Sequence, residues 1–354
     1  MKMSPTLPRY LMRWNHREEL PRAGDVVTTD HRLGELSVFT DLGLASIIDR
    51  YPRSAIEITM TGTDPSHPSE LQYCDPGTRS GLDLIQILRG GQLVLTLKDA
   101  HRHVPFLGSM TDRLIDEYSE CRHLGATKSH QCDVQIRSPD TQAYLSIGSR
   151  PSIRWQVRGS QQIRKYPFLG TAIDPNAIGR KLYRSGDRSV SCYFEPAMDD
   201  CCDLIDLDAG QMFAVSPHQP SRSIVGDSLS VSITTRYVDE TWLRNRSMVA
   251  GHDILRQFMD TKLSIAEDGT IDQHGVGAWC KRGMGRLASA CRCLTDERHD
   301  QAQAVDPTFR LDPVSSRCIT PTDATRPIHS QDGSTPVPYV PFMPCPTTLY
   351  ATET

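Results

Sequence analysis

Residues 138–167, SPDTQAYLSIGSRPSIRWQVRGSQQIRKYP, contain the strongest β-structure signal in the chain. Apolar and polar residues alternate on both sides of Gly159, which predicts two strands joined by a turn. The strand before the turn places Arg154 and Gln156 on one face and Trp155 on the other, because successive side chains of a strand point to opposite faces. This hairpin is therefore the centre of the predicted β-structure.

Further strands are predicted on both sides of this hairpin, wherever apolar residues alternate with polar ones. These strands cover residues 55–62, 92–100, 132–139, two segments of 201–217 that flank a turn at 208–210, and 227–238. Helical spacing of apolar residues predicts helices over residues 41–51, 80–91, 105–125, 174–185, 240–263 and 275–294. Residues 67–81 are predicted to form a loop because they are rich in Pro, Gly and Ser.

Three side chains in these helices carry specific expectations. Asp41 is expected to be the N-cap of the first helix. Leu82 is expected on the buried face of the second helix, and Glu117 on the exposed face of the helix over 105–125.

Short antiparallel strands with helices before and after them predict an α+β fold around a β-barrel or double-sheet core. The predicted organisation is an N-terminal extended segment (1–35), an α+β portion that packs on the core (36–129), the barrel core (130–240), a C-terminal helical region (241–319) and a disordered tail (320–354). The tail prediction rests on its high content of Pro, Thr and Ser.

The composition is that of a soluble globular protein, with 23% charged residues and a formal net charge of −4. No apolar run approaches the about 18 residues of a membrane span, and no export signal is recognised, so a cytoplasmic protein with no membrane partner is expected. The 11 cysteines are accordingly expected as reduced thiols. A nucleic-acid partner is not expected, because the chain has no global basic field, whereas a homo-oligomer is compatible with the sequence.

Four segments of the chain resemble bacterial jumonji-type (JmjC-like), cupin-like proteins. They are RYPRSAIEITMTG (50–62), IRSPDTQAYLSIGSRPSIRWQVRGSQQIRKYP (136–167), DLDAGQMFAVSPHQPSRSIVGDSLSVSITTRYV (206–238) and DPTFRLDP (306–313). The resemblance implies a double-stranded β-helix (cupin or jelly-roll) core with flanking N- and C-terminal helices. Active members of that family are Fe(II)- and 2-oxoglutarate-dependent oxygenases.

The resemblance also locates the positions where such an oxygenase holds its metal. The family's His-x-Asp pair aligns with Ser146 and Gly148, and its second His aligns with Ser221. A lysine that commonly binds the 2-oxoglutarate carboxylate aligns with Gln161. Serine hydroxyls are poor Fe(II) ligands, glycine has no side chain, and glutamine carries no charge for a charge-assisted pair. The resemblance therefore implies a degenerate cupin, a pseudo-oxygenase, for which no cofactor is expected.

The expected function is that of a module that binds a small molecule or a protein. The candidate pocket residues are Ser146, Gly148, Arg154, Gln156, Gln161 and Ser221. Whether the polar face of the hairpin lines a ligand cavity or fills a collapsed site is left open by the sequence.

Two enzymatic alternatives also stay open. One is an oxygenase (hydroxylase) with Fe(II) and 2-oxoglutarate at a displaced metal site around His218, with His130 and Asp140 as further candidate ligands. The other is a metal-free enzyme that uses the same cavity. We favour instead an exposed loop imidazole for His218 and a turn position for Asp140.

The basic segment 281–292 carries two weaker signals. Gly283, Gly285 and Ala288 form a G-x-G-x-x-A pattern, but no hydrophobic strand precedes it, so it does not predict a dinucleotide site. Its cations predict a solvated helix face, and a regulator that contacts nucleic acid is a third hypothesis based on them alone. The cysteines nearby, with His299, lack the paired spacing typical of a zinc site.

Overall fold

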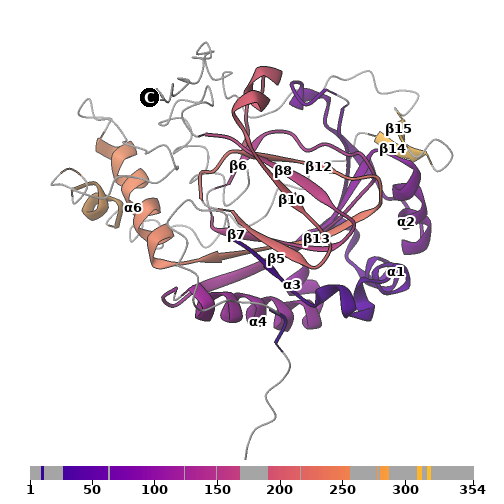
Figure 1. Cartoon of the computed structure of the whole chain (residues 1–354), viewed down its shortest axis with the longest axis horizontal. Coiled ribbons are helices and arrows are strands. Elements are labelled where there is room, and N and C mark those ends of the chain that lie inside the picture. The colour runs from indigo at the N-terminus through magenta and orange to yellow at the C-terminus, as the bar shows by residue number, and fades with distance from the viewer. Residues whose placement is uncertain are drawn as a thin grey trace, which may run out of the picture.

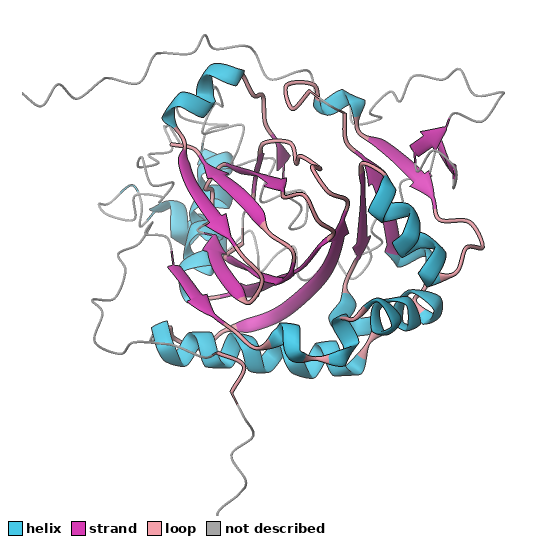
Figure 2. Cartoon of the chain, turned by 45° about the vertical axis from the view of Figure 1, so that its right-hand side comes forward, coloured by secondary structure: helices cyan, strands magenta, loops and turns pink. Residues whose placement is uncertain are grey.

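The computed structural model describes residues 9–11, 27–62, 64–122, 124–148, 150–167, 190–215, 217–255, 277, 280–286, 309–312 and 317–319. These residues form two β-sheets that face each other, and helices cover the outer side of the larger sheet (Figures 1 and 2). The candidate site lies between the two sheets.

The larger sheet has ten strands and runs the length of the molecule. Its order is β1 (Val27–Asp30), β11 (Gln211–Val215), β7 (Ser152–Arg158), β13 (Ser230–Val238), β5 (Lys128–Arg137), β4 (Leu93–Leu97), β2 (Ile56–Met60), β3 (Gln72–Asp75), β14 (Phe309–Asp312) and β15 (Arg317–Ile319). All neighbours are antiparallel except β3 and β14, which are parallel. The sheet continues across the predicted boundary at residue 130, because β4 pairs with β5.

The smaller sheet has five strands and closes the other side of the barrel. Its order is β10 (Asp203–Leu207), β8 (Gln161–Lys165), β12 (Ser221–Val225), β6 (Ser146–Ile147) and β9 (Val190–Ser191). In Figure 1 β6, β8, β10 and β12 lie opposite β5, β7 and β13.

The chain changes sheets at successive turns, and this defines the fold. The order β5-β13-β7-β11 in one sheet faces β6-β12-β8-β10 in the other. Successive strands β5 to β8 and β10 to β13 therefore alternate between the sheets, as in the double-stranded β-helix of cupins and jelly rolls. The predicted α+β fold with a double-stranded β-helix core is confirmed.

The two strands of the opening stretch are present, but they do not pair with each other as a hairpin would. β7 belongs to the larger sheet and β8 to the smaller one. Gly159 makes the corner between them: its φ is 67°, and a Cβ there would lie 2.7 Å from the Leu229 carbonyl oxygen. Because only glycine adopts that conformation without strain and without such a clash, the chain turns sharply between sheets.

The helices pack against the outer face of the larger sheet, where the main hydrophobic core lies (Figure 2). They are α1 (Asp41–Arg50), α2 (Gly81–Gly90), α3 (Ala100–His103) and α4 (Pro105–Arg122), and α6 (Glu240–Leu255) follows the barrel. Outward-facing Trp155 is fully buried in this core, and its Nε1 donates to Thr235 Oγ1 at 2.9 Å. Apolar side chains thus occupy the outer face of the larger sheet, and a smaller apolar cluster of Ile163, Leu207 and Phe213 lies inside the barrel.

Several local expectations are wrong. The N-cap of α1 is Thr40, whose side chain accepts from the Gly43 N–H, and Asp41 is the first helical residue. Leu82 is 49% exposed, because Leu84 and Ile87 share the buried face of α2 with its other apolar residues.

Two more corrections concern burial and pairing. Glu117 is buried, because its carboxylate accepts hydrogen bonds from the backbone N–H groups of Tyr10 and Leu11. The segment predicted as a loop over 67–81 contains β3, which is held by pairing with β2 and β14, the latter distant in sequence.

The cysteines differ in state. Those found as free thiols are Cys121, Cys132, Cys192, Cys201, Cys202 and Cys280. Cys74 in β3 is disulfide-bonded, so the expectation of reduced thiols is wrong for this residue.

Only part of the C-terminal region lies within the described residues, so only some of the predictions made for it can be compared with the structure. Residues 280–286 are helical, and a Cβ on Gly285 would lie 1.8 Å from the Ser247 carbonyl oxygen of α6. This close helix contact accounts for a glycine of the G-x-G-x-x-A pattern. The helix predicted over 174–185 and the tail after residue 320 lie outside the described residues. Among the helices that are described, none has the length and apolar character needed to cross a membrane.

Candidate ligand-binding site

The inner face of the barrel is defined by a hydrogen bond between its two sheets. Arg137 at the end of β5 donates from Nη1 to Ser223 Oγ on β12, at 2.7 Å. Strand register then places Ser230 beside Arg137, and Arg154 beside Thr234, on the same face. The inward side chains of β5, β7 and β13 are Asp133, Gln135, Arg137, Arg154, Gln156, Ser230, Ser232, Thr234 and Arg236. This part of the barrel interior is therefore lined by polar groups.

Two inward arginines share one acceptor. Gln161 Oε1 accepts from Arg137 Nη1 at 3.2 Å and from Arg154 Nη1 at 3.3 Å. The Gln161 amide nitrogen donates to Gln156 Oε1 at 2.6 Å and to Ser230 Oγ at 3.2 Å. The amide of Gln161 is thus fixed with its oxygen towards the two guanidinium groups.

Both guanidinium groups are cationic and poorly solvated. Burial, and secondarily the charge of Arg154, lower the pKa of Arg137 to about 9. Burial, and secondarily the charge of Arg236, lower the pKa of Arg154 to about 10. Both side chains remain protonated at neutral pH.

No carboxylate pairs with Arg137 or Arg154 within the described part of the chain. Asp133, the inward carboxylate two strands from Arg154, is already paired with Arg236 at 2.6 Å. Arg154 Nε and Ser232 Oγ are also enclosed without any hydrogen-bond partner. The interior therefore holds excess positive charge and unused hydrogen-bonding capacity.

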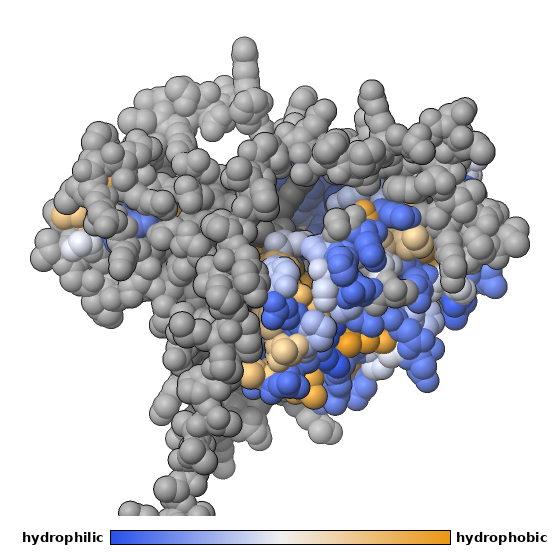
Figure 3. All heavy atoms as spheres, turned by 90° about the horizontal axis from the view of Figure 1, so that it is seen from above, coloured by the Kyte–Doolittle hydropathy of each residue, from blue (hydrophilic) through white to orange (hydrophobic). Residues whose placement is uncertain are grey.

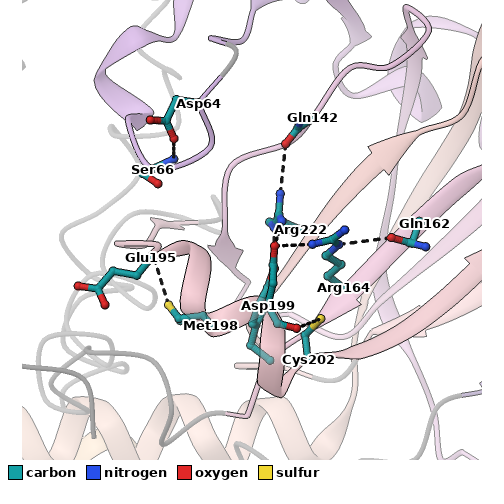
Figure 4. Close-up of polar contacts among 11 residues, drawn as sticks. Asp64, Ser66, Gln142, Gln162, Arg164, Glu195, Met198, Asp199, Cys202 and Arg222 are labelled. Carbon is teal, nitrogen blue, oxygen red and sulfur yellow. Dashed lines mark hydrogen bonds and ion pairs between the residues drawn. The ribbon is translucent and has the colours of Figure 1, made fainter. Parts of the chain in front are cut away.

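On the outer face of the smaller sheet, one carboxylate bridges another pair of arginines. Arg164 on β8 and Arg222 on β12 are cross-strand neighbours. Asp199, in the 3-10 helix η6 (Pro196–Cys201), receives hydrogen bonds from both guanidinium groups, and it lies between them in Figure 4. Like charges directly opposite each other are destabilising, and here one carboxylate compensates them.

The sequence-predicted pocket residues fall into two groups. Ser146 and Ser221 are direct cross-strand partners, and Gly148 follows at the end of β6, where its carbonyl accepts from the His218 N–H at 2.9 Å. The second group is Arg154, Gln156 and Gln161, joined by hydrogen bonds. Gln161 lies at the opposite end of β8 from Lys165, the residue that pairs with Ser221.

The first group does not fit an iron site with the family's ligand set. Two hydroxyls and a glycine stand where two imidazoles and a carboxylate are needed to hold Fe(II). Within the described ranges, no three side chains of His, Cys, Asp or Glu come together in a way that could hold a metal.

The displaced ligands considered from the sequence lie apart. His130 Nδ1 is 2.8 Å from Asp112 Oδ1, and Asp140 lies beyond the opposite end of β5. His218 is 2% exposed with a φ of 63°, so the prediction of an exposed loop imidazole is wrong. Its backbone bond to Gly148 places this turn against β6, which explains its burial.

Sequence reasoning missed Arg137, Ser223 and Ser230. The signal for Arg137 was present in CDVQIR (132–137), where Asp133, Gln135 and Arg137 alternate with apolar residues. Such alternation predicts one polar strand face, but it does not tell which face lies inside the barrel.

Comparisons with known proteins give only distant similarity. No family model and no curated protein matches the chain. Among solved structures, one of Escherichia coli YcfD shares 12% identity over 80% of this chain and 67% of that chain, with a TM-score of 0.42. A second structure of YcfD, described as a ribosomal oxygenase, shares 11% identity over 77% of this chain and 64% of that chain, with a TM-score of 0.39. An RmlC-like cupin from Shewanella frigidimarina shares 11% identity over 31% of this chain and 68% of that chain, with a TM-score of 0.20. This chain thus spans about two thirds of the length of YcfD, and the fold assignment rests on its own strand order.

Proposed function

We propose that this protein uses its double-stranded β-helix as a binding module for a polar small molecule, without the His-x-Asp and His ligands of an iron oxygenase. The observation that carries this proposal is the set of enclosed polar groups between the sheets that have no partner, Arg154 Nε and Ser232 Oγ. Burying a polar group without a hydrogen bond is unfavourable, and most such groups in proteins have partners. A bound polar ligand would supply those partners.

The polarity of the interior argues against a barrel that has merely collapsed. A vestigial site would be expected to fill with apolar side chains, because these pack densely without desolvation cost. Apolar Ile163, Leu207 and Phe213 pack together in one part of the interior. Fully buried Gln156, Ser230 and Ser232 nevertheless line the larger sheet, while Arg154 keeps part of its surface accessible to water. This part of the interior has therefore kept polar side chains beside the apolar cluster.

The described surface supports a small-molecule ligand better than a protein partner. On the face shown in Figure 3 it is predominantly polar, with hydrophobic residues in small groups. Large hydrophobic side chains that are exposed lie on separate elements: Leu42, Leu82, Phe106, Tyr193, Leu204 and Leu243. Docking surfaces for proteins are more often contiguous apolar patches.

Anaerobic titration with Fe(II), followed by removal of free metal and measurement of iron per chain, tests the proposal. We expect far less than one iron per chain, because Ser146 and Ser221 are poor iron ligands. One tightly held iron per chain would overturn the proposal. Its loss in His218→Ala would then place the metal at the buried imidazole and favour the displaced oxygenase site.

A further inference from the structure

We infer that the ligand of this barrel is a small oxyanion, a carboxylate or a phosphate, held by Arg154 with Arg137 behind it. The inference rests on the proposed binding function and names the chemical class of its ligand. It follows from the geometry of the two guanidinium groups and from the charge around them.

Arg154 has one edge of its guanidinium engaged and one edge unused. Nη1 donates to Gln161 Oε1 at 3.3 Å, whereas Nε and Nη2 make no hydrogen bond with any described residue. These two nitrogens form the side edge of the guanidinium, which matches the spacing of two oxygens of a carboxylate or phosphate. Nε is enclosed whereas Nη2 is not, so Nη2 is the donor of this edge that an oxyanion reaches.

Arg137 is the fixed member of the pair. Arg137 is 3% exposed, and its guanidinium donates to Ser223 Oγ, to Gln161 Oε1 and to the Thr141 carbonyl oxygen. Arg154, in contrast, is only partly buried. An incoming anion would therefore contact Arg154 directly, while Arg137 adds positive potential from the closed side.

The charge balance inside the barrel favours an anion over a neutral ligand. Arg137 and Arg154 donate to the same amide oxygen, so their two positive charges lie close together. A cationic ligand would be repelled by both charges. The corresponding pair on the outer face, Arg164 and Arg222, is bridged by Asp199. An oxyanion at Arg154 would play inside the barrel the part that Asp199 plays outside it.

Thermal unfolding of the full chain with added anions tests this inference. The probes are sodium succinate and sodium phosphate, each compared with sodium chloride at equal ionic strength. We expect at least one probe to raise the melting temperature saturably above the chloride control, because a ligand that binds only the folded state stabilises it. A larger response to succinate assigns a carboxylate, and a larger response to phosphate assigns a phosphate.

Matched variants locate the site. Arg154→Gln should weaken the response by at least tenfold in apparent Kd, and Arg154→Lys should restore little of it, because a compact ammonium lacks the planar, fixed donors of a guanidinium. Arg102→Gln removes the same charge from an exposed helical position and should respond as the wild type does.

Arg154→Met separates a binding role from a structural one. Without added anion this variant should melt at the same temperature as the wild type or higher, since a partly buried cation without a carboxylate partner is removed. The inference is overturned if neither anion exceeds chloride, if Arg154→Gln responds like the wild type, or if Arg154→Met melts well below it. Any of these results leaves the iron titration unaffected, so failure of the anion site is distinguishable from failure of the metal-free binding function.

Discussion

Gln161 holds the two arginines of the barrel interior through a single amide oxygen. That oxygen accepts hydrogen bonds from two guanidinium groups, Arg137 and Arg154. An amide dipole satisfies donors but cancels no charge, so the two cations remain uncompensated. The residue was expected from the sequence to mark the loss of an oxygenase lysine, and in the structure it instead organises a pair of arginines.

Gln161→Glu should therefore abolish the response of the protein to anions. The substitution keeps the shape of the side chain and replaces the shared oxygen by a carboxylate, and hydrogen bonds to charged groups contribute about 1.5–3 kcal/mol. The gain at the two arginines is offset because a carboxylate oxygen cannot replace the Nε2 donor to Gln156 Oε1, so we expect the free energy of unfolding at pH 7 to stay within about 1 kcal/mol of the wild-type value in urea denaturation. A destabilised Gln161→Glu variant that still responds to anions would contradict this account of the arginine pair.

His31 gives the protein a predictable dependence on pH. The residue is 3% exposed, and its ring packs edge-on against Trp155 and accepts a hydrogen bond from the Leu33 N–H through Nδ1. Burial lowers the pKa of His31 from 6.5 to about 4. Between these values the unfolded chain binds a proton that the folded chain does not, so stability falls as pH drops below 6.5 and this loss is complete below pH 4.

The expected loss from His31 is about 3 kcal/mol between pH 7 and pH 4. His31→Asn, whose side-chain oxygen can still accept from Leu33, should remove that part of the dependence. Urea denaturation of both proteins across this range measures it. Parallel pH curves for the wild type and the variant would show that His31 does not titrate in this way.

At the scale of elements, the corners between strands decide the fold. β7 and β8 are separated by Gly159 and Ser160 yet belong to different sheets. Gly159 also allows the Leu229 carbonyl to approach the corner, which ties it to the start of β13. The corner thus connects the two sheets that enclose the arginine pair.

Gly159→Ala should destabilise the protein by about 1–3 kcal/mol, because a non-glycine residue is strained at positive φ and its Cβ would meet the Leu229 oxygen. Gly125→Ala is the matched control, since a Cβ there meets nothing within 4 Å. Chemical denaturation of both variants measures the difference. Equal stability of the two variants would contradict the role given to this corner.

Strand positions in this barrel could be predicted from alternation, but strand pairing could not. The run DSLSVSITTRYV (227–238) predicts β13 because Val231 and Ile233 alternate with polar residues. A turn between two strands does not specify whether they pair with each other or enter different sheets. Here β7 and β8 enter different sheets. β3 was missed because its partners come from elsewhere in the chain.

The candidate site could be predicted only in part for the same reason. Arg154 and Gln156 were expected on one strand face, and Ser146 with Ser221 came from the family resemblance. The contact of Arg137 with Ser223 joins residues 86 positions apart, which no local pattern reveals. The charge imbalance emerges only when the two sheets face each other.

At the scale of the whole molecule, the two faces of the larger sheet have different roles. The outer face packs against helices α1 to α4 (Figure 1) and holds the main core, whereas the inner face of β5, β7 and β13 is polar and holds the arginine pair. Stability therefore comes mainly from the outer layer, because apolar burial is the dominant favourable term in folding. This separation leaves the barrel interior free to retain cations for a ligand.

Calorimetric titration of the full chain with succinate or phosphate, whichever gives the larger thermal shift, tests the central claim most directly. One titration is performed in EDTA and one with one equivalent of Fe(II) under anaerobic conditions. Because the proposed site is built from Arg154 and Arg137, we predict one anion per chain and a Kd that is the same within about twofold in both titrations. Binding that occurs only with Fe(II) present would contradict the account.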